Sequence, residues 1–166
     1  MTIDIPKLKR KASRKKRHYT LFLKKLKRKN PKNIQRIAKQ IDAEVWQEID
    51  CLECANCCKT MVPTYTRGDM KRIADHFGIT PRQLYDKYLA HDDNNDIVNQ
   101  QTPCQWLGKD NKCKIYAIRP RDCRGFPHLK RSHFFDQSET FINNIKYCPA
   151  TMRMLEKLEE RVDQLK

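Results

Sequence analysis

Eight cysteines are the residues of this 166-residue sequence with the greatest capacity for chemistry. Four form the pattern C-x2-C-x2-C-C and four are scattered downstream. They are Cys51, Cys54, Cys57 and Cys58, followed by Cys104, Cys113, Cys123 and Cys148. Thiolates at three-residue spacing can converge on one metal ion or cluster, as they do in zinc and iron–sulfur sites. The pattern therefore predicts a metal centre with these eight cysteines as candidate ligands.

The adjacent pair Cys57 and Cys58 limits how the thiols can be shared. Neighbouring side chains project in different directions from a helix or a strand, so the two are expected to serve different centres, unless one is not a ligand. Eight thiols can supply two zinc ions, two clusters, or one four-ligand centre with spare thiols. Any one of them can also be only a small buried apolar side chain.

The local pattern favours iron–sulfur ligation over zinc. Three cysteines at C-x2-C spacing and a distant Cys148-Pro149 are similar to elements of bacterial ferredoxins. Structural zinc sites usually contain two separated C-x2-C pairs, and the second half of this sequence has none. The expected cofactor is one or two iron–sulfur clusters of the 4Fe-4S type, with zinc as the alternative.

Basic side chains near the cysteines are candidates for cofactor binding. Arg119 and Arg124 lie on either side of Cys123, and together with Arg121 they can hydrogen-bond to cluster sulfurs, lower a thiol pKa or receive an anionic substrate. The alternative is a capped turn whose arginines pair outward. His128 can be interpreted as a ligand or an acid–base group, although a histidine with a purely structural role is the simpler interpretation.

Positive charge is concentrated near the amino terminus. The net charge is +15, and residues 1–32 contain 14 of the 35 Lys and Arg with a single acid, Asp4, which gives this segment +13. Such a segment attracts nucleic acid or an anionic membrane surface. We expect residues 7–32 to form a basic arm for RNA or DNA, or else a plain soluble extension, because no recognised nucleic-acid-binding fold accompanies the charge.

The segments that must position the cysteines are expected to be mainly helical. Apolar residues recur at three- and four-residue spacing within 19–26, 34–49 and 69–77, and from Pro149 onward. Asn30-Pro31 should end the first helix and Gly78 the third. Thr80-Pro81-Arg82-Gln83 predicts another helix start with a capping box. The last helix should pack on the core rather than form a coiled coil, because its apolar stripe covers barely two heptads.

The predicted fold class is mainly α and irregular: a small, metal-stabilised cysteine-cluster domain with a β-hairpin. The hairpin is expected at residues 132–135 and 140–142, and residues 91–101 are expected to form a polar loop. One third of the residues are charged, which leaves a modest apolar core for metal binding to supplement. We divide the chain into a basic arm (1–32), a metal-binding domain with its leading helix (33–150) and a final helix (151–166).

The expected location is the cytoplasm. No run approaches the roughly 18 apolar residues needed to cross a bilayer. The basic amino terminus lacks the apolar region of a secretory signal. Thiols stay reduced in the cytoplasm, which favours metal binding over disulfides.

Further motifs surround the cysteines. They are Pro103-Cys104 followed by Trp106-Leu107, the segment from Cys113 to Pro127 with its Arg119-Pro120 and Cys123-Arg124, and the final Cys148-Pro149. With the C-x2-C-x2-C-C pattern they resemble the CxxCxxCC family, zinc- or iron-chelating domains often described as iron–sulfur-cluster proteins. The resemblance spans residues 51–148. Ala55 stands where the family frequently has Gly, so the first turn is expected to form without positive φ.

The resemblance implies a metal core built from these cysteines and leaves the activity open. A larger relative methylates flagellin lysines, but this sequence has no glycine-rich loop for the S-adenosylmethionine that such chemistry needs. Two function classes remain. One is a redox or protein-modifying enzyme whose iron–sulfur centre acts on a protein or small molecule; the other is a zinc-stabilised module that presents its basic arm to RNA or another acidic partner.

Overall fold

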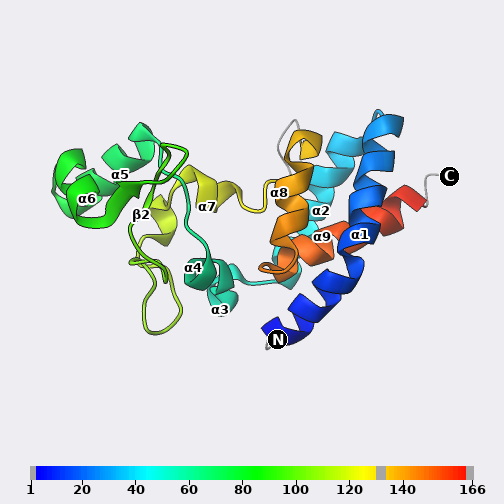
Figure 1. The fold of residues 1–166 in the computed structure, drawn as a ribbon, viewed down its shortest axis with the longest axis horizontal. Helices are drawn as coiled ribbons and strands as arrows, with labels where there is room; N and C mark the ends of the chain where they lie inside the picture. The colour runs from blue at the N-terminus through cyan, green and yellow to red at the C-terminus, as the bar shows by residue number, and fades with distance from the viewer. Residues whose placement is uncertain (1–2, 130–133, 164–166) are drawn as a thin grey trace. The chain divides into compact units, whose positions relative to one another are not determined.

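The computed structural model describes residues 3–129 and 134–163, and it divides the chain into two compact units. Unit 1 contains Met1–Asp50 and Pro127–Lys166, and unit 2 contains Cys51–Phe126. The described part is mainly helical with a two-stranded antiparallel hairpin, which confirms the predicted fold class (Figure 1). None of the described helices has the length and apolar character needed to span a membrane.

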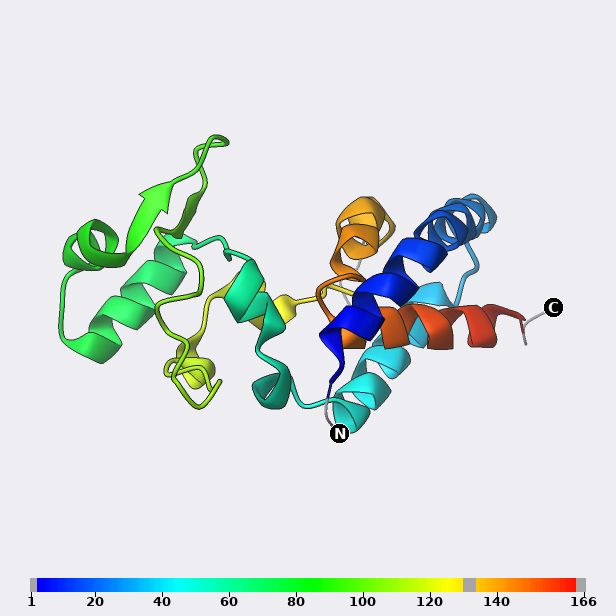
Figure 2. The same ribbon diagram turned by 60° about the horizontal axis from the view of Figure 1, so that its bottom comes forward.

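Unit 1 is a packed set of helices. It contains α1 (Ile5–Lys29), α2 (Ile34–Glu48), the 3-10 helix η2 (Phe134–Gln137), α8 (Ser138–Asn144) and α9 (Pro149–Asp163). Helix α2 packs against α9, and α1 packs against both α8 and α9, as Figures 1 and 2 show from two directions. The stripe on α9 faces this core through Met152, Leu155 and Leu158. This confirms that α9 packs on the core within its own chain.

Helix α1 extends well beyond the short helix that the sequence predicts. The Asp4 side chain caps its first turn by accepting a hydrogen bond from the Lys7 backbone N–H at 2.8 Å. Asn30, at φ 38°, ends the helix just before Pro31, which confirms the predicted break. One side of α1 is buried in the core of unit 1 through Leu8, Ala12, Tyr19, Leu23 and Leu26. Most of the predicted basic arm is therefore built into a hydrophobic core along one side.

The predicted hairpin at residues 132–135 and 140–142 is wrong in its position. Residues 132 and 133 lie outside the described residues, whereas the rest of this segment is η2 and α8. Helix α8 buries Phe141 and Ile142 in the core of unit 1, and Ile145, which directly follows the helix, is buried in the same core. Positions 141, 142 and 145 share one helical face. The run at 140–142 is too short for its spacing to distinguish a strand from a helix, so packing against the core decides that it is helical.

The hairpin forms instead within unit 2, mainly in the stretch predicted as a loop. Strands β1 (Leu89–His91) and β2 (Ile97–Asn99) pair with Leu89 opposite Asn99. A tight turn joins them: the Asn95 N–H donates to the Asp92 carbonyl at 2.9 Å, and Asn95 has φ 63°. Asn is among the residues that tolerate this left-handed conformation, which allows the polar run to close a hairpin.

Unit 2 carries the cysteine motif on short elements. These are α3 (Cys51–Cys54), α4 (Asn56–Thr60), α5 (Arg67–Phe77), α6 (Pro81–Tyr88), β1, β2, the 3-10 helix η1 (Tyr116–Ile118) and α7 (Arg121–Gly125). The predicted capping box of Thr80 and Gln83 is present, and Gly78 ends α5 at φ 64°, as predicted. The core of the unit is small and consists of Tyr65, Ile73, Ala74, Leu84, Leu89, Trp106 and Ile115.

Two leucines of α1 test whether this helix is an integral part of unit 1. Leu23 is 2% exposed and Leu21 is 57% exposed. We expect Leu23→Ala to lower the free energy of unfolding by about 2–5 kcal/mol, because it leaves a cavity in the core. Leu21→Ala, the matched control, should change it by no more than about 0.5 kcal/mol. Equal effects of the two substitutions in urea denaturation would show that α1 does not contribute to the core.

Candidate metal centre

The first four cysteines lie on two short helices joined by one residue. Ala55 connects α3 to α4 with φ 49° and ψ 10°, and its N–H donates to the Cys51 carbonyl at 3.2 Å. The expectation that this turn avoids positive φ is therefore wrong. A residue in the left-handed conformation changes the direction of the chain between the two helices, and this conformation costs an alanine about 1–2 kcal/mol.

Cys57 and Cys58 lie next to each other on α4, with their sulfur atoms 4.0 Å apart. Two sulfurs on one tetrahedral zinc would be separated by about 3.8 Å, since each Zn–S bond is about 2.3 Å. The adjacent side chains are thus closer together than the sequence argument assumed. Their other interactions differ, however: Cys57 hydrogen-bonds with Cys51, whereas Cys58 interacts with more distant cysteines.

Cys104 and Cys113 reach Cys58 through a turn that follows the hairpin. The Cys104 N–H donates to the Cys58 carbonyl at 2.8 Å, which ties this turn to α4. Leu107 and Cys113 form an antiparallel bridge, so the two cysteines stand on opposite arms of the turn. Gly108 lies where the arms meet, and a Cβ there would lie 3.2 Å from the Lys112 carbonyl. A larger residue there would also have to displace the Asp110 carboxylate, whose Oδ1 would lie 2.5 Å from that Cβ.

Cys123 lies on α7, whose start is held by the buried side chain of Asp69 on α5. Oδ1 of Asp69 accepts hydrogen bonds from the Arg121 N–H at 3.0 Å and from the Arg72 guanidinium at 2.6 Å. Arg72 also donates to the carbonyls of Ile118 and Arg119, at 3.2 and 3.0 Å. One carboxylate and one guanidinium thus fix the path of the chain just before Cys123.

The four thiols of Cys58, Cys104, Cys113 and Cys123 form a mutually interacting group. We call them the four-thiol group. Burial raises the pKa of Cys104, Cys113 and Cys123, and every pair within the group contributes a further electrostatic interaction between thiols. Negative charge on any one of them therefore disfavours charge on the others. A bound cation removes this repulsion, so the group is suited to metal thiolates.

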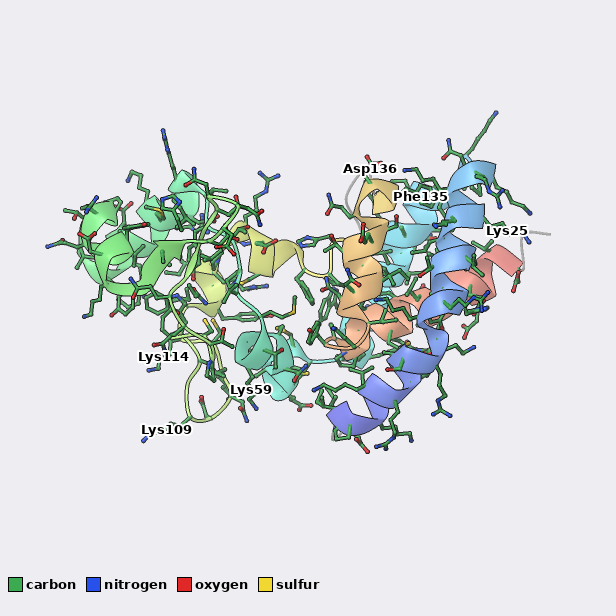
Figure 3. All side chains as sticks on the ribbon, viewed as in Figure 1. Lys25, Lys59, Lys109, Lys114, Phe135 and Asp136 are labelled. Carbon is green, nitrogen blue, oxygen red and sulfur yellow. The ribbon has the colours of Figure 1, made fainter. Side chains whose placement is uncertain are left out.

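Cys58 is the exception within this group. A hydrogen bond from the Cys57 thiol, with a smaller contribution from Lys59, lowers the pKa of Cys58 below its ordinary value despite its burial. The hydrogen bonds of Cys57 with Cys51 and Cys58 raise the pKa of Cys57 itself. Lys59 stands on α4 beside the pair, and Lys114 follows Cys113 on the neighbouring turn (Figure 3). Cys58 is thus the thiol of this group whose surroundings most favour the thiolate, the form that binds metal.

Cys51, Cys54 and Cys57 form a second, smaller set around α3 and α4. Cys57 hydrogen-bonds with Cys51, and Cys54 interacts electrostatically with Cys51 and Cys58. Burial raises the pKa of Cys54. Cys148 belongs to unit 1, where it precedes α9 and packs against the apolar core while remaining partly exposed. Its predicted role as a ligand stays a prediction.

The donor set fits a metal group, because cysteine thiolates are ligands of both zinc and iron–sulfur centres. In the described part of the chain, no three Cys, His, Asp or Glu side chains are arranged as they would be around a single ion. A buried amide supports the fit. Asn99 Oδ1 accepts hydrogen bonds from Tyr65 at 2.6 Å and from Gln105 at 3.0 Å, which fixes the orientation of the amide.

That orientation leaves the Asn99 amino group for a sulfur. Nδ2 is buried and makes no hydrogen bond of ordinary geometry with the described residues. It lies close enough to Cys104 to favour the thiolate, an effect smaller than the opposing effect of burial. An N–H donor directed at a ligand sulfur is typical of the surroundings of metal thiolates. Neither Asn99 nor Asp69 stands out from the sequence, although the Thr66-x-x-Asp69 capping box could have been recognised.

The predicted cofactor-binding arginines are engaged in local structure. The Arg119 guanidinium lies over the Tyr116 ring at 3.8 Å and donates to the Tyr116 carbonyl. Burial raises the pKa of Cys113, and the positive charge of Arg119 offsets only a small part of that rise. Arg124 reaches the Arg119 carbonyl at 3.5 Å and is otherwise exposed. Their contact with a cofactor remains a prediction. His128 is buried in unit 1, at φ 73°.

Comparison with known proteins agrees with this geometry. A family model described as "CxxCxxCC: Putative zinc- or iron-chelating domain" matches residues 50–149, a range that includes all eight cysteines. An uncharacterized protein of Methanocaldococcus jannaschii is 31% identical over 81 residues, which are 47% of this chain and 43% of that protein. The match thus spans less than half of that relative. No solved structure matches the chain.

Replacing Asp69 tests whether its carboxylate holds unit 2 together. Burial would raise the pKa of Asp69, but hydrogen bonds from Thr66 and Arg72 outweigh this effect and keep the pKa below its ordinary value. The charged form therefore stabilises the fold fully above the unfolded-state pKa of about 3.9, and this contribution disappears as the pH falls through the folded-state value. We expect Asp69→Asn to cost roughly 1–3 kcal/mol at pH 7.

The measurement is urea denaturation of the wild type and the variant from pH 7 to pH 3. The stability difference should be constant down to about pH 5 and narrow below pH 4. Asp75→Asn is the matched control, because Asp75 lies on the same helix with its side chain exposed in a pair with Lys71. A difference for Asp69→Asn no larger than that of the control would contradict the role assigned to this carboxylate.

Proposed function

The chain belongs to the CxxCxxCC family of zinc- or iron-chelating domains, and from this premise we propose that its four-thiol group binds an iron–sulfur cluster with a redox role. The observation that carries the proposal is the interaction of Cys58 with all three of Cys104, Cys113 and Cys123. Four thiolates are the usual ligand set of a 2Fe-2S or a 4Fe-4S cluster.

The cysteine pattern of the sequence favours a cluster over a single zinc ion. Three cysteines at C-x2-C spacing and the distant Cys148-Pro149 are similar to elements of bacterial ferredoxins. Structural zinc sites usually contain two separated C-x2-C pairs, and the second half of this chain has none. Iron–sulfur is therefore the proposed cofactor and zinc the alternative.

The protein's own residues would set the properties of such a centre. When bound, an iron–sulfur cluster accepts and releases single electrons. The Asn99 amide would donate to the Cys104 sulfur, and the positive charge of Lys59 would lie beside Cys58; both effects stabilise the reduced, more negative state. The partial exposure of the cysteines leaves an electron-transfer partner a short path to the centre.

Cys51, Cys54 and Cys57 are the proposed ligands of a second centre. Cys51 interacts with both Cys54 and Cys57, and these two also interact with Cys58 of the four-thiol group. Cys148 is also predicted from the sequence to be a ligand, and the variants described below test it together with these three cysteines. A single four-ligand centre with spare thiols is the simpler alternative.

Metal analysis after anaerobic purification tests the proposal. We expect iron and acid-labile sulfide in equal amounts, about four of each per 4Fe-4S cluster, and an absorbance near roughly 400 nm that decreases on addition of dithionite. One or two zinc ions without sulfide, and no response to dithionite, would replace the redox proposal with a structural zinc–thiolate site.

Single Cys→Ser variants test the grouping. Cys104→Ser, Cys113→Ser or Cys123→Ser should each remove the metal of the four-thiol group, because a serine hydroxyl is a poor substitute for a thiolate. Cys51→Ser and Cys54→Ser should leave that metal in place and remove only a second centre, if one is present. Equal loss of all iron in every variant would contradict two separate groups. Cys148→Ser shows directly whether that residue holds metal.

The Asn99 amide can be tested without touching a ligand. We expect Asn99→Ala to weaken metal retention about 10- to 100-fold, because the Cys104 sulfur loses its buried donor. Retention is measured as bound iron or zinc against increasing chelator concentration, and circular dichroism verifies the fold. The control is Asn94→Ala, an exposed residue in the turn of the same hairpin. Unchanged retention in Asn99→Ala would exclude a role for this amide.

A further inference from the structure

The outward side of α1 carries a row of cations. With 3.6 residues per turn, this side lies opposite the buried residues Leu8, Tyr19 and Leu26. All members of the row are exposed. We call the row the basic face, and it consists of Lys7, Arg10, Arg14, Arg17, Lys24, Lys25 and Arg28. Lys25 can be followed where it extends from the helix in Figure 3.

The described acids of unit 1 leave the basic face uncompensated. The pairs made by α1 involve cations at its flanks: Lys11 with Glu156, His18 with Glu159, and Lys27 with Asp136. Acids on α2 pair with cations of α9 instead, as Glu44 does with Arg161. In the described ion pairs, none involves a residue of the basic face.

This arrangement costs stability in the isolated protein. Arg10 and Arg14 stand four residues apart, Arg14 and Arg17 three, and Lys24 and Arg28 four, so each pair of like charges is adjacent on the helix surface. Each such pair destabilises a helix by roughly 0.2–0.5 kcal/mol. A polyanionic partner would convert this repulsion into attraction.

The dimensions of the row match a nucleic acid duplex. From Lys7 to Arg28 the helix advances 21 residues, or about 32 Å at roughly 1.5 Å per residue. A duplex presents one negative charge per about 1.7 Å of its axis, so phosphates are available along this whole length. Four of the seven cations are arginines, whose forked guanidinium groups can each bind a phosphate through two hydrogen bonds.

The burial of α1 argues against a membrane surface. A helix that lies in a membrane interface inserts its apolar side between the lipids. The apolar side of α1 is instead packed into the core of unit 1 with α8 and α9. On the outward side, Leu21 is the large apolar residue that stands among the cations. The surface thus offers charge without an apolar side to insert.

We infer that the basic face of α1 binds the sugar–phosphate backbone of a nucleic acid duplex without reading its sequence. This inference rests on unit 1 and does not depend on the metal proposed for unit 2. Backbone binding of this kind releases counterions, so the affinity should fall steeply with salt. It would place the cysteine centre of unit 2 on the same chain as a nucleic-acid-binding surface.

The test is fluorescence anisotropy of the full-length, metal-loaded protein with 20-base-pair RNA and DNA duplexes of mixed sequence between 50 and 300 mM salt. The triple variant Arg10→Gln, Arg14→Gln, Arg17→Gln should bind at least about tenfold more weakly at the lowest salt, with a salt slope smaller by about 3. The matched control is Lys32→Gln, Arg36→Gln, Lys39→Gln, which removes the same charge from exposed positions of unit 1 outside the row. The control should bind within about threefold of the wild type.

Each outcome is decisive once circular dichroism shows that both triple variants are folded. Binding of either duplex that depends on the basic face supports the inference, and the two duplexes show whether RNA or DNA is preferred. Equal losses in both triple variants would overturn it in favour of attraction by net charge alone. Failure of the wild type to bind either duplex, with or without binding to phosphatidylserine vesicles, would also overturn it.

Discussion

The position of Cys123 among the four interacting thiols depends on a buried carboxylate. Asp69 is 2% exposed, and its carboxylate accepts hydrogen bonds from Thr66 at the start of α5, from the Arg72 guanidinium and from the backbone N–H of Arg121. Thiolates repel one another, so without a metal the rest of the unit must hold them close together. A bound metal then stabilises the arrangement by removing the repulsion. In unit 2 that scaffold is a polar network, because the segment before Cys123 has little regular secondary structure of its own.

A small aromatic cluster is connected to the surroundings of Cys104. Trp106 stacks on Phe77 at 5.3 Å and packs against Tyr88 at 4.7 Å, while its indole N–H donates to Tyr65 at 3.1 Å. Tyr65 in turn donates to Asn99, whose amide lies beside Cys104. The apolar core of unit 2 is therefore linked by hydrogen bonds to the amide beside Cys104. A substitution that shifts this core should also shift that amide relative to the Cys104 sulfur.

Unit 1 is stabilised in a different way. Its core is built from whole helices with broad apolar sides, and it includes more than half of the described buried apolar residues. Charge is displaced to the outside, where α1 carries cations on the side opposite its buried residues. The two units thus offer two kinds of chemistry: soft thiolate ligands in unit 2 and a hard, extended positive surface in unit 1.

The amino-acid sequence by itself determined the features that depend on near neighbours. The cysteine pattern, the helices of 34–49 and 69–77, the stop at Gly78, the capping box at Thr80 and the break at Asn30-Pro31 all follow from interactions within a few residues. The family resemblance follows from the same local motifs. These predictions are confirmed because caps, stops and amphipathic periods are set over one or two helical turns.

Tertiary structure alone decided which distant groups meet. Cys58 approaches Cys104, Cys113 and Cys123 across 46 to 65 residues, and no spacing rule relates them. Packing made a helix of residues 140–142, moved the hairpin to 89–99 and drew most of the basic segment into a core. It also holds Ala55 in a conformation that alanine alone disfavours. In each case the free energy of long-range contacts outweighed a weak local preference, which is why the sequence could not reveal these features.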